Sequence, residues 1–112
     1  MAAGDDFMEL ATQEGKYLLV FAPRRSRAVE ELTNIFSWLD RHNLPYYYDR
    51  RKGLVTLENG TRIEVTDNIS ASMVLRQTTP DGILAIKSLN LPWDVSQRIK
   101  VKELLGTQLF TV

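Results

Sequence analysis

The apolar stretch KYLLVFA, residues 16–22, is the strongest indication of fold class in this chain. Its apolar residues are continuous rather than alternating, which is typical of a strand that is buried on both faces and lies inside an α/β sheet. Pro23 ends the strand, because proline lacks the N–H that a further ladder hydrogen bond needs. The stretch therefore predicts a central strand with helices on both sides of the sheet.

The flanking sequence supplies further helices and strands. Residues 46–67 read as strand material, and Asn59-Gly60 predicts a hairpin closed by a type I′ turn. Helices are predicted up to about residue 14, from Ser26 to Asn43, over 69–77 and over 95–105, with a second buried strand at 83–86. Residues 107–112 form either an edge strand or a surface segment. We therefore predict one α/β domain over 1–112, with a mixed sheet, a β-hairpin and helices on both faces.

Composition excludes several classes of function. The chain has 14 basic and 14 acidic residues, whereas a DNA-coating protein is usually basic overall. It has no cysteine and a single histidine, His42, so we expect no disulfide, no metal site and no cofactor. The acidic N-terminus lacks a secretory signal, and no apolar run approaches the roughly 20 residues of a membrane span. A cytoplasmic protein without membrane contact is expected.

Three arginines, Arg24, Arg25 and Arg27, follow the central strand and precede a helix. A helix N-terminus presents unpaired N–H groups and partial positive charge, so arginines there favour an anion. Ligands of open α/β sheets also gather at the carboxyl ends of strands. The alternative is that these arginines are solvated surface residues balanced by neighbouring glutamates.

A second basic cluster, Arg50, Arg51 and Lys52, follows the tyrosines at 46–48. Interleaved aromatic and basic residues can stack bases while holding phosphates, although tyrosine is also a common strand residue. We take Arg50 and Arg51 as candidate contact residues, together with Tyr47 and Trp38. Trp38 lies off the centre of its helix's apolar stripe, so it borders either the core or a contact surface.

Motifs for catalysis are absent from the sequence. It contains no GxxxxGK(S/T), no GxSxG and no HExxH, and its acid pairs have no diagnostic spacing. We therefore expect no enzyme activity and no catalytic residues.

The middle of the chain resembles the ATPase core of phage large terminase subunits and related RecA-like helicase domains. The resemblance is carried by a strand ending in AP before a basic turn and an amphipathic helix, by LENGTRIEV (57–65) and by RQTTPDGILAI (76–86). These segments are similar to the family's N-G-(S/T)-R-I hairpin and to the strand that bears its Walker B acids. No Walker A loop precedes the first strand, and Ile86-Lys87-Ser88 stands where the acids are expected. The resemblance implies a phage or mobile-element protein that retains a binding surface.

Together these observations predict a non-catalytic binding module, such as a phage-type accessory or host-modulating protein, that acts on a protein partner. The alternative is a nucleic-acid-binding protein that uses the basic clusters at 24–27 and 50–52. The sequence leaves open whether the two clusters share one face, and what the oligomeric state is.

Overall fold

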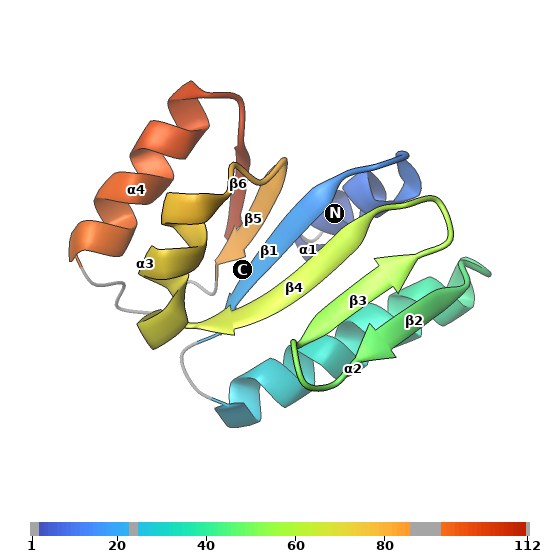
Figure 1. Ribbon diagram of the computed structural model, residues 1–112. Coiled ribbons are helices and arrows are strands. Elements are labelled where there is room, and N and C mark those ends of the chain that lie inside the picture. The colour runs from blue at the N-terminus through green and yellow to red at the C-terminus, as the bar shows by residue number, and fades with distance from the viewer. Residues whose placement is uncertain (1–2, 23–24, 86–92, 112) are drawn as a thin grey trace.

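The computed structural model describes residues 3–22, 25–85 and 93–111, with the side chains of 3–4, 25–26 and 67–72 excepted. Its elements follow the predicted order of helices and strands (Figure 1). The helices are α1 (Ala3–Glu9), a short 3₁₀ helix η1 (Leu10–Thr12), α2 (Arg25–Arg41), α3 (Asn68–Gln77) and α4 (Trp93–Leu104). The strands are β1 (Tyr17–Ala22), β2 (Tyr46–Asp49), β3 (Leu54–Leu57), β4 (Arg62–Asp67), β5 (Gly82–Ala85) and β6 (Gln108–Thr111).

The six strands form one mixed sheet in the order β2-β3-β4-β1-β5-β6. Strands β4, β1, β5 and β6 run parallel to one another, whereas β3 pairs antiparallel with β4, and β2 pairs antiparallel with β3 at the edge of the sheet. The predicted α/β fold with a mixed sheet and a hairpin is confirmed. Residues 108–111 resolve the alternative left open for the end of the chain, since they form the edge strand β6.

The central strand β1 is buried on both faces, as its continuous apolar sequence predicts. Leu18 and Val20 face α1 and α2, whereas Leu19 and Phe21 face α3 and α4, and all four side chains are fully buried. Because successive strand residues point to opposite faces, an unbroken apolar run can fill two cores at once.

The helices cover the two faces unequally. On one face α1 and α2 lie behind the sheet, and α2 extends beneath β2 and β3 (Figure 1). On the other face α3 and α4 pack on β1 and β5 through Leu75, Val95 and Ile99. In the described part of the chain, no helix lies over β2 and β3 on this second face, so that part of the sheet is open (Figure 1).

The hairpin lies where Asn59-Gly60 predicts it, but its turn is not type I′. Gly60 has a φ of 88°, whereas Asn59 does not have the positive φ that a type I′ turn requires. The Gly60 N–H donates to Leu57 O and the Leu57 N–H donates to Thr61 O, which closes a three-residue loop. The Asn59 side chain is instead used for tertiary contacts, because its Nδ2 donates to the carbonyl oxygens of Ala11 and Gln13.

The described helices include none long and apolar enough to cross a membrane.

Candidate functional site

The first basic cluster is only partly described. Arg24 lies outside the described residues, and Arg25 begins α2 but its side chain is not described. Arg27 is described, and its charge is used within its own helix. Its Nη1 lies 2.8 Å from Glu30 Oε2, and its Nη2 lies 3.3 Å from Glu31 Oε1. The guanidinium of Arg27 is therefore part of an ion-pair network, as the surface-residue alternative requires.

Arg27 also faces away from the hairpin. It lines a hollow of about 380 Å³ between α1 and α2, together with Asp5, Asn34 and Trp38. Its partner Glu31 is buried, at 6% exposure, whereas the Arg27 side chain is partly exposed. The buried glutamate was not singled out from the sequence, because a glutamate in the first turns of a helix is normally solvated.

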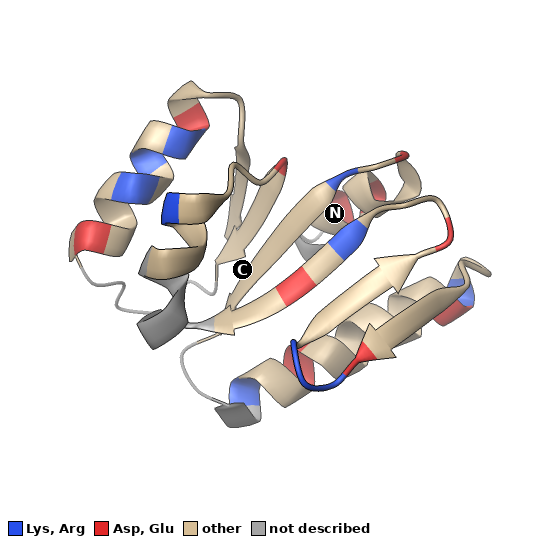
Figure 2. Cartoon of the chain, viewed as in Figure 1, with Lys and Arg blue, Asp and Glu red and all other residues tan. Residues whose placement is uncertain are grey.

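The second basic cluster forms an exposed turn between β2 and β3, which we call the basic turn (Arg50, Arg51 and Lys52). Figure 2 shows it as an uninterrupted cationic loop near the beginning of α2. The Asp49 Oδ1 accepts hydrogen bonds from the backbone N–H of Arg51 at 3.0 Å and of Lys52 at 3.4 Å. This cap fixes the backbone of the turn and leaves the three cationic side chains directed to solvent.

Gly53 completes the turn and cannot readily be replaced. Its φ is +61°, and a Cβ at this position would lie 3.1 Å from the carbonyl oxygen of Val65. The Gly53 carbonyl in turn accepts from the Val65 N–H at 3.0 Å. The basic turn is thus attached directly to the carboxyl-terminal half of β4, where ligands of parallel sheets bind.

A groove of about 510 Å³ separates the basic turn from the first turns of α2, and we call it the basic groove. Its lining residues come from α2, from β2 and the basic turn, and from the end of β4: Ala28, Val29, Leu32, Tyr48, Arg50, Arg51, Lys52, Gly53, Val65 and Thr66. Its walls are therefore apolar and its rim is cationic. Of the described cationic side chains of the two clusters, Arg50, Arg51 and Lys52 line this groove, whereas Arg27 lines the hollow between α1 and α2.

The two aromatic candidates differ completely in environment. Tyr47 is 70% exposed and lies on the open face of the sheet, whereas Tyr46 and Tyr48 pack against Phe36 on the opposite face. Trp38 is buried, at 6% exposure, and its ring stacks on His42 with 3.8 Å between ring centroids. Trp38 therefore belongs to the core, and of the two aromatic candidates only Tyr47 is exposed to solvent.

A cluster that sequence reasoning missed lies on the open face. The Tyr17 hydroxyl donates a hydrogen bond to Glu64 Oε2, and the Arg62 guanidinium lies 5.0 Å from the centroid of the Tyr17 ring. Burial raises the pKa of Tyr17 well above its ordinary value, and the hydrogen bond to the Glu64 carboxylate raises it further. Register could have revealed this cluster, because Tyr17 pairs with Arg62 across β1 and β4.

No known family description matches the sequence, and no curated protein matches it. Solved structures do match its fold. The large terminase from the thermophilic bacteriophage D6E matches with a TM-score of 0.74 at 11% sequence identity, over 97% of this chain and 29% of that chain. The same terminase in complex with ADP matches with a TM-score of 0.71 at 13% identity, over 97% and 29%. The ATPase domain of the Thermus phage P74-26 large terminase matches with a TM-score of 0.72 at 13% identity, over 96% of this chain and 51% of that one.

The fold is thus that of phage large terminase ATPase domains, and the resemblance expected from the sequence is confirmed at the level of fold. The chain spans about three tenths of the D6E terminase and about half of the P74-26 domain. The expectation of a non-enzymatic protein is corrected by this finding, because the structures that share the fold are ATPase domains, which are enzymes. The absence of short motifs was a poor guide, since a fold of this class can be matched in part without them.

Proposed function

We propose that this chain is the nucleic-acid-binding part of a phage terminase-type ATPase assembly, and that it holds the phosphate backbone at the basic groove. The single observation that carries the proposal is the position of the basic turn. Its three cations line a groove at the carboxyl-terminal edge of parallel strands, opposite the beginning of α2. Helix N-termini and strand carboxyl ends are the places where phosphates bind in α/β folds.

Charge within the groove supports an anionic ligand. The lining residues include Arg50, Arg51 and Lys52 and no aspartate or glutamate. Asp49, the acid next to the turn, uses a carboxylate oxygen for the backbone N–H groups of the turn. The chain as a whole is neutral, so the positive potential is local and suits one contact with a polyanion better than wrapping along it.

The test is fluorescence anisotropy with a labelled DNA duplex and a labelled single strand, titrated at several salt concentrations. Phosphate binding predicts that log affinity falls linearly with log salt concentration. The double substitution Arg50→Ala/Arg51→Ala is expected to weaken binding and to reduce the slope by about 0.9 per side chain on duplex and about 0.7 on single strand. The matched control Arg41→Ala/Lys100→Ala removes two exposed cations elsewhere and is expected to leave the slope almost unchanged.

Three outcomes would contradict the proposal. These are the absence of binding at about 50 mM salt, a salt slope that both double variants reduce equally, and a slope that neither variant changes. Unlabelled ADP is included as a competitor, because one matching terminase structure contains it. Displacement of the strand by ADP would place a mononucleotide in the groove, and a strand-binding role there would be wrong.

A further inference from the structure

The open face of the sheet carries one cross-strand row of aromatic and polar side chains. Tyr47 of β2 pairs with Thr56 of β3, Thr56 pairs with Arg62 of β4, and Arg62 pairs with Tyr17 of β1. Neighbouring strands lie about 4.8 Å apart, so the row extends about 14 Å from one tyrosine to the other. We call these four residues the tyrosine row.

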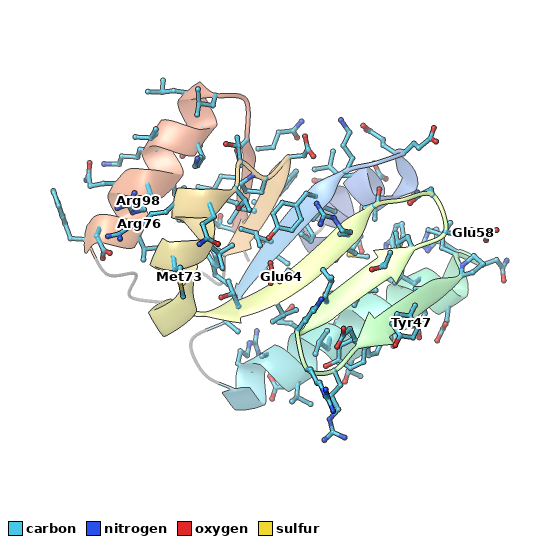
Figure 3. The ribbon with its side chains drawn as sticks, in the orientation of Figure 1. Tyr47, Glu58, Glu64, Met73, Arg76 and Arg98 are labelled. Carbon is cyan, nitrogen blue, oxygen red and sulfur yellow. The ribbon has the colours of Figure 1, made fainter. Side chains whose placement is uncertain are left out.

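The tyrosine row is accessible from Tyr47 to Arg62. Tyr47 is 70% exposed, Arg62 is exposed and Thr56 is half-buried. Figure 3 shows Tyr47 on β2 and Glu64 on β4, in the part of the sheet that α3 and α4 do not cover. An exposed tyrosine on a sheet surface, with a threonine and an arginine beside it, forms a flat platform with an aromatic face and hydrogen-bond donors.

The row is continuous with the basic turn. Tyr47 precedes Asp49 on the same strand by two residues, and Arg50 and Arg51 follow directly. At about 3.3 Å per residue, Tyr47 lies about 10 Å along the strand from Arg50, the first residue of the turn. The basic groove lies on the α2 side of the sheet and the tyrosine row on the open side, and the exposed basic turn lies at the end of both. A ligand whose phosphates contact the turn from the open side brings its next groups onto the open face.

The neighbouring row determines which groups fit there. It contains Asp49, Leu54 and Glu64, and both of its carboxylates already accept hydrogen bonds within the protein. Two carboxylates disfavour phosphates over the centre of this face. Uncharged bases are not repelled, and their amino groups can donate to carboxylate oxygens.

We propose that the open face binds unpaired bases of a single nucleic-acid strand, with a base stacked on Tyr47 and the adjoining phosphates on the basic turn. Stacking on a protein ring needs a base that is free of its own stack, so the occupant is single-stranded rather than duplex. This inference rests on the proposed function and specifies the form of nucleic acid that the site prefers.

The test compares a single strand with a duplex of equal phosphate number, using the 112-residue chain and three variants. Tyr47→Ala is expected to lower single-strand affinity by about 5- to 150-fold, the usual effect of removing one stacked ring, and to leave duplex affinity unchanged. Tyr47→Phe keeps the ring and is expected to retain single-strand binding. Arg50→Ala/Arg51→Ala is expected to weaken both nucleic acids through the salt-dependent term.

The outcomes separate the two proposals. If Arg50→Ala/Arg51→Ala weakens both nucleic acids but Tyr47→Ala affects neither, or affects both equally, the stacking inference is wrong and phosphate binding stands. Loss of affinity in Tyr47→Phe equal to that in Tyr47→Ala would also overturn stacking, since the phenylalanine ring stacks as well. If neither nucleic acid binds the wild-type chain, both proposals fall together. Tyr47 is largely solvent-exposed, so circular dichroism is expected to show both variants folded.

Discussion

Thr61 joins the segment before β1 to the hairpin, and its replacement by valine tests this joint. Thr61 is fully buried, and its Oγ1 donates to Gln13 O at 2.5 Å and accepts from the Lys16 N–H at 3.1 Å. Valine has nearly the same shape but no hydroxyl. The net contribution of one such hydrogen bond is about 0.5–1.5 kcal/mol, so losing two is expected to lower the free energy of unfolding by about 1–3 kcal/mol.

The matched control for Thr61 is serine. Thr61→Ser keeps both hydrogen bonds and loses one buried methyl group, which costs about 1 kcal/mol. Urea unfolding gives the free energies, and amide hydrogen exchange separates the two causes. The Lys16 amide is expected to exchange faster in Thr61→Val and to stay protected in Thr61→Ser. A valine variant with unchanged unfolding free energy and an equally protected Lys16 amide would refute the reasoning.

Three further substitutions test the core, the alkaline limit and the ion pair. Leu84→Ala removes a core side chain that is 3% exposed, and it is expected to lower the free energy of unfolding by about 2–5 kcal/mol. The control Leu104→Ala, at a position 88% exposed, is expected to change it by no more than about 0.5 kcal/mol. Equal effects in chemical unfolding would be evidence against the core assignment of Leu84. Because the pKa of Tyr17 is raised in the folded chain, the folded chain keeps the Tyr17 proton at pH values where the unfolded chain loses it. The contribution of Tyr17 to the free energy of unfolding is therefore fully present below about pH 10 and is lost as the pH rises above it. In urea unfolding measured across that alkaline range, Tyr17→Phe is expected to lose less stability than the wild-type chain. Arg27→Ala leaves the buried Glu31 carboxylate without its ion pair and is expected to lower the free energy of unfolding by about 1–2 kcal/mol. Adding Glu31→Gln removes the unpaired charge and is expected to restore most of that loss. No recovery in the double variant would mean that Arg27 stabilises the protein through packing alone.

The sequence was sufficient for the elements and for the centre of the sheet. The apolar run at 16–22 indicates β1 because burial on both faces removes the alternation that a half-exposed strand shows. Asn59-Gly60 located the hairpin but not its turn type. The local preference for a type I′ turn is overridden by a tertiary contact, because the Asn59 amide donates to the carbonyl oxygens of Ala11 in η1 and of Gln13 just after it.

The candidate site was harder to predict because it depends on which segments become neighbours. The arginines at 24–27 and the basic turn look equivalent in sequence. In the structure Arg27 forms ion pairs within α2, whereas Asp49 caps the backbone of the basic turn and leaves its side chains exposed. Trp38 lies off the apolar stripe of its helix and is still buried. The tyrosine row appears only once strand register is known, since its members are far apart along the chain.

The central strand has a consequence for how the chain is synthesised. Leu18 pairs on one side with Ile63 and on the other with Gly82, so β1 emerges from the ribosome long before either of its neighbours exists. Such distant pairings make folding slow, because the entropy of a long closed loop is lost before any ladder contact forms. Nascent chains halted before residue 82 hold an apolar strand with one unpaired edge, and such an edge is prone to pair with another chain and aggregate.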